Sequence, residues 1–135
     1  MGNNTSYVPN YKESDYKKIR PGQNVYKIDK KNVYWRGHKI NADGSTFQNL
    51  KYNYGKDINN IFWDGKMTNI PITEIESFVC LKKYYGKSEN YVYYKGKIIQ
   101  ADVKSFVINK DVIKDKKFFY KNGIKYKNNL SRTSV

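Results

Sequence analysis

The stretch Val92-Tyr93-Tyr94-Lys95-Gly96 indicates the architecture, because three hydrophobic or aromatic residues placed just before a glycine recur along the chain. The glycines are Gly37, Gly65, Gly96 and Gly123, at spacings of 28, 31 and 27 residues. The triplets before them are Val33-Tyr34-Trp35, Ile61-Phe62-Trp63, Val92-Tyr93-Tyr94 and Phe119-Tyr120-Lys121. A period of this length predicts one supersecondary unit copied in tandem.

Turn-forming side chains divide each unit into strands. Asp29, Asp57, Ser88 and Asp115 stand eight positions before the four glycines, and Asp favours turns because its side chain bonds nearby backbone. In the first unit we predict strands over 25–28 and 33–35, a turn over 29–32, and a tight turn at Gly37 into a strand over 38–40. Later strands are expected near 52–56, 83–86, 91–94, 97–99, 112–114, 118–120 and 124–126.

A second motif joins one unit to the next. Phe47, Phe78 and Phe106 each follow a hydroxyl residue, and an acid, Asp43, Glu74 or Asp102, stands four positions before each phenylalanine. An acid at that place can cap a short helical turn through the free amides at its start. We therefore expect capped helical turns between the units, with each phenylalanine delivered to the core.

The expected fold is a single, mostly β domain of tandem antiparallel hairpin or meander repeats. Branched and aromatic residues far outnumber Ala and Leu, a bias that favours strands. We assign 13–126 to the domain, with a partial unit at 13–24 and units near 25–51, 52–82, 83–110 and 111–126. Residues 1–12 and 127–135 match no unit and are expected to be frayed.

Strand alternation gives each unit two faces. The first and third triplet positions, such as Val33 and Trp35, are assigned to the core. The middle positions form a second row, made of Tyr34, Phe62, Tyr93 and Tyr120. This row either packs beneath the capped turns or is an aromatic strip open to a partner. We expect the packed arrangement, because large exposed apolar patches are uncommon on monomers.

The charge suggests a partner of opposite sign. The formal net charge is +14, with 23 Lys but 3 Arg among the 135 residues. A basic surface gains from releasing counterions on nucleic acid, but Arg, which grips phosphate in a bidentate fork, is scarce. We therefore expect an acidic protein partner, with nucleic acid as an alternative. The oligomeric state stays open.

The residue inventory does not favour catalysis. Cys80 and His38 are the single cysteine and histidine, so no internal disulfide, cysteine zinc site or paired-histidine metal site is expected. Half of the acids occupy recurring turn and cap positions. We predict no enzyme activity, metal or cofactor. Without an apolar run of roughly 20 residues or an N-terminal hydrophobic segment, no membrane span is expected. The sequence as given would be cytoplasmic, with the envelope open if a leader was removed.

Three segments and one connector carry a family resemblance. Residues 29–37 read DKKNVYWRG, 89–97 read ENYVYYKGK, 115–123 read DKKFFYKNG, and 101–107 read ADVKSFV. They resemble the DKNYY family of bacterial proteins over roughly residues 25–126. The resemblance implies a Tyr-rich repeat without established catalytic residues, found in bacterial envelopes and beside toxin genes, where some members look like immunity proteins.

The expected function is that of a non-catalytic protein-binding module. Its most concrete form is an immunity or inhibitor protein that neutralises a bacterial toxin, as in toxin–antitoxin pairs, through a complementary surface. Alternatives are binding of an anionic polymer, either nucleic acid or a cell-wall polymer, and a structural cell-surface repeat. The candidate contact residues, chosen as lysines beside the hairpins and aromatic anchors, are Trp35, Lys56, Trp63, Lys66, Tyr94, Lys95, Lys97, Lys121 and Lys125.

Overall fold

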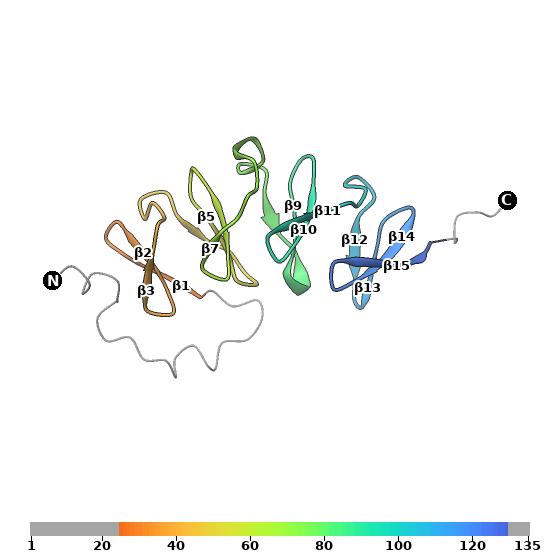
Figure 1. Ribbon diagram of the computed structural model, residues 1–135, viewed down its shortest axis with the longest axis horizontal. Coiled ribbons are helices and arrows are strands. Elements are labelled where there is room, and N and C mark those ends of the chain that lie inside the picture. The colour runs from red at the N-terminus through yellow and green to blue at the C-terminus, as the bar shows by residue number, and fades with distance from the viewer. Residues whose placement is uncertain (1–24, 130–135) are drawn as a thin grey trace.

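The structure is a computed structural model that describes residues 25–129 (Figure 1). Four small antiparallel sheets lie side by side in chain order along the long axis of the molecule. Helix is limited to two short 3₁₀ segments in the described residues, η2 (Ile72–Glu74) and η3 (Lys82–Tyr84). The prediction of a mostly β chain forming a single domain is confirmed.

Each sheet is a meander in which every strand pairs with the next one in sequence. The first sheet contains β1 (Tyr26–Asp29), β2 (Asn32–Trp35) and β3 (His38–Ile40). The second contains β4 (Gln48–Asn49), β5 (Tyr54–Lys56), β6 (Ile61–Trp63) and β7 (Lys66–Met67). The third contains β8 (Val79–Cys80), β9 (Tyr85–Lys87), β10 (Val92–Tyr94) and β11 (Lys97–Ile99). The fourth contains β12 (Val107–Asn109), β13 (Val112–Lys114), β14 (Phe118–Lys121) and β15 (Ile124–Asn128).

The sheets begin earlier than the units drawn from the sequence. Strands β4, β8 and β12 follow the connector phenylalanines directly and pair with β5, β9 and β13. Two or three residues are too few to show alternation, so these strands carried no visible signal. At the other end β15 continues to Asn128, and Asn129 is buried, so 127–129 belong to the fold rather than to a frayed end. The expectations for 1–12, for the partial unit at 13–24 and for 130–135 lie outside the described residues.

A two-residue turn closes the hairpin at each of the four glycines. In the third sheet Lys95 and Gly96 have φ values of 50° and 80°, and Tyr94 pairs with Lys97 on either side of them. Two successive positive φ values define the type I′ turn, whose twist matches that of the flanking strands. The residue before the glycine also has a positive φ in the other three hairpins. The tight turns predicted here are therefore present.

The expected helical turns between the sheets are mostly not helical. Asp43 and Asp102 each accept a hydrogen bond from the amide two or three residues ahead, Ser45 N at 3.0 Å and Ser105 N at 3.0 Å, but the chain makes a simple turn there. Only η2 is helical, and it begins after Pro71 with no side-chain cap. Glu74 lies at its end and is buried. Three residues between the acid and the phenylalanine are too few to form a helix in most connectors.

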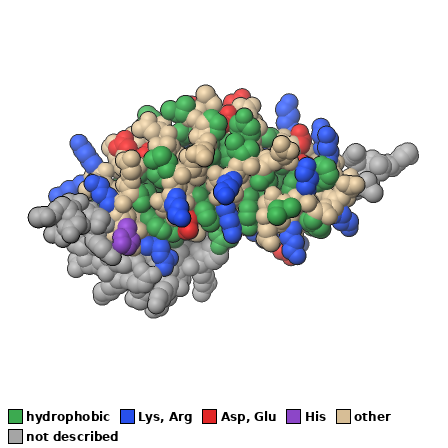
Figure 2. All heavy atoms as spheres, viewed as in Figure 1, with side chains coloured by type: hydrophobic (Ala, Val, Ile, Leu, Met, Phe, Trp, Pro, Cys, Tyr) green, Lys and Arg blue, Asp and Glu red, His purple; other side chains and the backbone are tan. Residues whose placement is uncertain are grey.

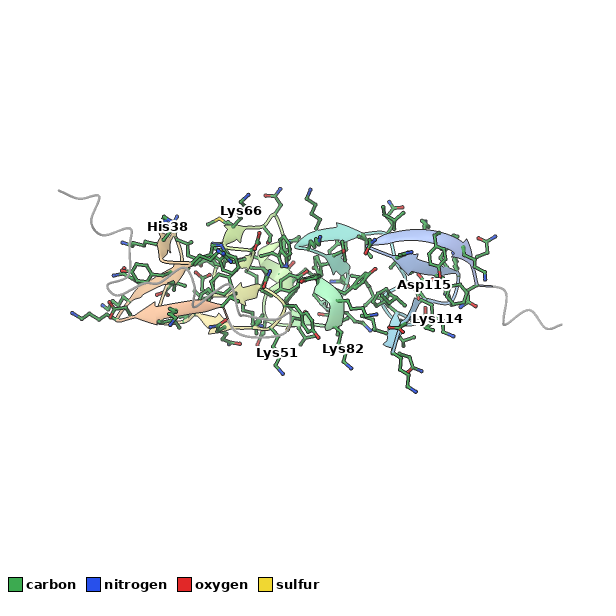
Figure 3. The ribbon with its side chains drawn as sticks, turned by 90° about the horizontal axis from the view of Figure 1, so that it is seen from below. His38, Lys51, Lys66, Lys82, Lys114 and Asp115 are labelled. Atoms are coloured by element: carbon green, nitrogen blue, oxygen red, sulfur yellow. The ribbon has the colours of Figure 1, made fainter. Side chains whose placement is uncertain are left out.

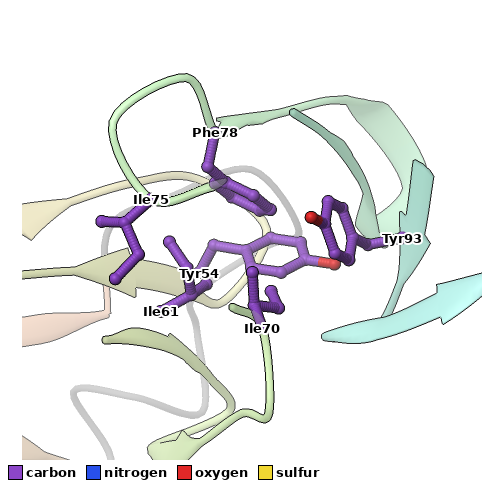
Figure 4. Close-up of a cluster of buried hydrophobic side chains, with 6 residues drawn as sticks. All are labelled: Tyr54, Ile61, Ile70, Ile75, Phe78 and Tyr93. Atoms are coloured by element: carbon purple, nitrogen blue, oxygen red, sulfur yellow. The ribbon is translucent and has the colours of Figure 1, made fainter. Parts of the chain in front are cut away.

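Apolar burial is concentrated at the junctions between sheets. Three separate clusters are centred on Tyr26 and Phe47, on Tyr54 and Phe78, and on Tyr85 and Phe106. The second cluster, shown in Figure 4, combines Tyr54 and Ile61 of one sheet with Tyr93 of the next. The expected single core is thus divided into three. Each sheet of short strands needs a neighbour to become stable.

The middle row of aromatic residues is buried, so the expectation of packing is confirmed and the open aromatic strip is wrong. Tyr34, Phe62, Tyr93 and Tyr120 retain 5%, 1%, 0% and 4% of their exposure. The connector phenylalanines lie against three of these rings. The centroid distances are 6.0 Å for Phe47–Phe62, 5.4 Å for Phe78–Tyr93 and 5.7 Å for Phe106–Tyr120. Both faces of the inner sheets are therefore covered.

A tyrosine hydroxyl bridges each junction. The Tyr54 hydroxyl donates to the carbonyl of Tyr84 at 2.9 Å and accepts from the amide of Gly96 at 2.9 Å. Tyr26 does the same with the carbonyl of Asn53 and the amide of Gly65, and the Tyr85 hydroxyl accepts from the Gly123 amide at 2.8 Å. Burial raises the pKa of Tyr54, so the phenol stays protonated and can serve both partners.

In each of the second, third and fourth sheets a carboxylate accepts hydrogen bonds from the residues of the central turn. In the second sheet Asp57 accepts from the amides of Asn59, Asn60 and Asp43. The third sheet has Ser88 at that position, and its carboxylate comes from Glu74 in the connector.

The Glu74 carboxylate accepts from Ser88 Oγ at 2.6 Å, from the Asn90 amide at 3.0 Å and from Asn90 Nδ2 at 2.7 Å. Hydrogen bonds from Ser88 and then Asn90 lower the pKa of Glu74. The negative charge is therefore kept although the residue that carries it has changed.

The bridging hydroxyl predicts a selective loss of stability in Tyr54→Phe. The substitution leaves the ring in place but removes the partner of the Gly96 amide and one of the two donors to the Tyr84 carbonyl, which should lower the free energy of unfolding by about 1–3 kcal/mol. Urea unfolding followed by circular dichroism measures the change. Tyr126→Phe is the matched control, because Tyr126 is 61% exposed on β15. Equal effects in the two variants would contradict the bridging role.

The carboxylate exchange predicts coupling between positions 74 and 88. Ser88→Asp alone brings a second carboxylate against Glu74 and should destabilise the protein, because like charges in one site repel. Adding Glu74→Gln should recover most of the loss, since the amide can donate to the new Asp. A double-mutant cycle in urea should give a coupling free energy of about 1 kcal/mol or more. Additive effects would show that the two positions do not share one charge.

Candidate functional site

Five of the nine candidate residues lie around one groove. The groove has a volume of about 750 Å³ and runs between the β6–β7 hairpin and the β10–β11 hairpin. The candidates at it are Trp63, Lys66, Tyr94, Lys95 and Lys97. They come from two sheets and are brought together by the junction between them. Figure 2 shows lysine side chains standing among hydrophobic ones on the face it displays, with few acidic side chains beside them.

Strand register determines which side chains can face one another across the groove. Trp63 pairs with Lys66 in the second sheet, so both lie on the face directed toward the third sheet. Ile98 pairs with Tyr93, and Tyr93 packs in the cluster shared with the second sheet. Ile98 therefore lies on the face directed back toward Trp63. The buried side chain of Ile70 also lines the groove, so its interior is apolar and its rim carries lysines.

Lys95 lies against three aromatic rings. Its Nζ is 5.4 Å from the centroid of Tyr94, 5.6 Å from Tyr84 and 5.9 Å from Trp63. The Trp63 and Tyr84 rings are perpendicular, with centroids 6.1 Å apart, and the Trp63 indole donates to the carbonyl of Tyr52 at 3.1 Å. An ammonium beside ring faces is held by the ring quadrupoles. Lys95 thus presents a positioned charge at the groove.

The three aromatic candidates serve the junctions as well as the surface. Trp35, Trp63 and Tyr94 are each half-buried, and each covers the turn glycine of the following sheet. A Cβ on Gly65 would lie 2.4 Å from Trp35, and one on Gly123 would lie 2.5 Å from Tyr94. Because the rings are only half-buried, part of each ring surface remains accessible. Trp35 does not line the groove.

Lys56 is occupied within the fold. Its Nζ donates to the carbonyls of Ile75, Glu76 and Phe78 at 2.9, 3.3 and 3.2 Å. Burial lowers the pKa of this lysine. Its charge holds the connector after η2 against the second sheet, a positioning role that spacing alone did not indicate.

The last two candidates belong to the fourth sheet. Lys125 Nζ lies 4.4 Å above the ring of Phe118. Lys121 lines a smaller hollow of about 420 Å³ between the third and fourth sheets, together with Tyr94. The structure therefore separates Trp35, Lys56, Lys121 and Lys125 from the groove that gathers the other five.

Within residues 25–129 no group of three or more His, Cys, Asp or Glu side chains could hold a metal ion. His38 is exposed on β3, and the half-buried Cys80 accepts a hydrogen bond at Sγ from the amide of Lys51 at 3.4 Å. The same part of the chain contains no helix long and apolar enough to span a membrane.

Two contributors to the site were missed in the sequence. Ile98 and Ile70 lie in the apolar interior, yet neither stands at one of the positions that recur in the motifs of the sequence. Ile98 carried a usable signal, because a large apolar residue two positions after the turn glycine falls on an outer strand, where alternation places it on the face of Tyr93. The bridging tyrosines had a clearer signal, since Tyr26, Tyr54 and Tyr85 all stand eleven positions before a turn glycine.

Comparison with known proteins agrees with the motifs. The DKNYY family matches residues 26–131, a span that includes all four sheets and the groove. No curated protein and no solved structure matches the chain. On the extent of that match, the chain belongs to the DKNYY family.

Proposed function

We propose that this chain is a non-catalytic protein-binding module that neutralises a bacterial toxin by direct contact, as an immunity protein does. The observation that supports it most is the gathering of Trp63, Lys66, Tyr94, Lys95 and Lys97 around one groove. Those residues combine aromatic surface with positive charge. Binding hot spots commonly pair an aromatic anchor with a charged group at the centre of an interface.

Charge supports an acidic protein as the partner. Lys66, Lys95 and Lys97 are all exposed at the groove, and the whole chain carries a formal charge of +14. Complementary fields speed the encounter of two proteins and disfavour partners of the wrong sign. An enzyme whose catalytic cleft is lined by carboxylates would be attracted to this face and blocked by it.

Rigidity favours inhibition by a preformed surface. We propose that the four sheets are tandem copies of one unit, because the same hydroxyl bridge and the same tight turn recur at successive junctions. Each junction fixes one sheet against the next, so the two hairpins that border the groove are held before the partner arrives. A preorganised surface loses less entropy on binding.

The proposal predicts that three lysines are needed for protection. Cells that express the product of the neighbouring gene should grow when this chain is co-expressed, and the two proteins should form a complex of defined stoichiometry. The variant Lys66→Glu, Lys95→Glu, Lys97→Glu should weaken the complex about tenfold or more and abolish protection, because it reverses the charge of the contact surface. Growth and calorimetry are the measurements.

The matched control is Lys82→Glu, Lys104→Glu, Lys117→Glu, which changes the formal charge equally at three exposed lysines away from the groove. Figure 3 shows Lys66 and Lys82 on opposite sides of the ribbon. Urea unfolding checks that both variants fold. If the two variants bind and protect alike, the groove is not the contact surface. If the neighbouring product is neither bound nor neutralised, the proposed function fails.

A further inference from the structure

We infer that the groove recognises a specific element of an acidic protein: one large apolar or aromatic side chain with carboxylates on both sides of it. This inference rests on the proposed function and specifies how the partner is read. It follows from the difference between the interior of the groove and its rim, which fit two different chemical groups.

The interior fits an apolar side chain. Ile98 is 44% exposed and, by strand register, faces the half-exposed ring of Trp63 across the groove. Ile70 lies between the two sheets in the same apolar cluster as Trp63. A volume of about 750 Å³ accommodates a Phe, Trp or Leu side chain with part of the backbone that carries it. Removing the Ile98 surface from water would favour such a guest.

The rim fits carboxylates on either side of that side chain. Lys66 shares the face of Trp63 in the second sheet, and Lys95 stands at the β10–β11 turn of the third sheet, so ammonium groups border the groove from both hairpins. Lys97 also lines the groove, but it pairs with Tyr94, whose ring packs toward the fourth sheet. The contacts of Lys95 with the Trp63, Tyr84 and Tyr94 rings orient its charge. A partner with acids flanking its apolar residue would satisfy both components, whereas an anionic polymer would use only the lysines.

The substitution Ile98→Lys separates these two modes of binding. It adds positive charge at an exposed position while removing apolar surface. Binding that depends only on charge should become tighter in this variant, because the field of the groove increases. Binding that inserts an apolar side chain should weaken about tenfold or more, the loss expected from a large side chain left in water. The matched control is Ile124→Lys, since Ile124 is 68% exposed on β15 and does not line the groove.

The probes are two synthetic peptides, acetyl-Asp-Asp-Phe-Asp-Asp-amide and the same peptide with Ala in place of Phe. Their dissociation constants for the full chain are measured by NMR titration, which also follows the Trp63 indole N–H and the Ile98 amide. We expect the Phe peptide to shift both signals and to bind about tenfold or more tightly than the Ala peptide. We expect the Ile98→Lys variant to lose that preference and the Ile124→Lys variant to keep it.

Three results would overturn the inference: equal affinity for the two peptides, tighter binding of the Phe peptide to Ile98→Lys, or shifts confined to residues outside the groove. Tighter binding of polyphosphate than of either peptide would also overturn it, in favour of an anionic polymer. The outcomes separate from those of the proposed function. If the neighbouring gene product is neutralised equally well by Ile98→Lys, the proposed function stands and the inference fails. If the Phe preference is found but no toxin is neutralised, the recognition element stands and the proposed function fails.

Discussion

The hydrogen bonds of the junction tyrosines are the constraint on which the rest of the structure depends. Each sheet has three or four strands of two to five residues, and sheets of that size are marginal alone. Stability must therefore come from the faces that neighbouring sheets bury against each other. The Tyr54 hydroxyl fixes that contact, because it joins the carbonyl of Tyr84 to the amide of Gly96. Without the hydroxyl the Gly96 amide would lose the partner it has at the junction, whereas the Tyr84 carbonyl would keep only its bond from the Lys95 amide.

The same constraint places the groove. Because Tyr54 holds the turn at Gly96, the Trp63 ring comes to lie over that turn, where a Cβ on the glycine would approach the Trp63 side chain to 3.0 Å. The adjacent turn residue, Lys95, is then brought to the edge of the ring. The residues that pack the junction therefore also form part of the candidate binding surface. Substituting the aromatic residues would disturb both, whereas the exposed lysines and Ile98 can be changed with less effect on the fold.

Much of the β architecture was predictable, because turn glycines and the triplets before them mark local structure. The strands at 38–40, 97–99 and 112–114 were placed correctly for that reason. The strands β4, β8 and β12 are too short to show a period, and the junction contacts join residues 38 to 42 positions apart. A spacing pattern cannot show that Lys56 is consumed by the connector carbonyls or that Lys66 and Lys95 share a groove. Those facts arise only when sheets pack.

The junctions share their hydrogen bonds but differ in side chains, and that difference explains why the groove with a ring-bound lysine is at the second junction. The position of Lys95 is held by Asp64 in the second sheet and by Asn122 in the fourth, so neither neighbouring turn offers a cation. Tyr84, which supplies a ring beside Lys95, corresponds to Asp111 at the third junction, where the carboxylate pairs with Lys83 at 3.0 Å. The same hydroxyl bridges thus recur at successive junctions, while a few turn residues give one of them a lysine held against aromatic rings. Selection for binding can act on those few residues without altering the hydroxyl bridges that keep the sheets together.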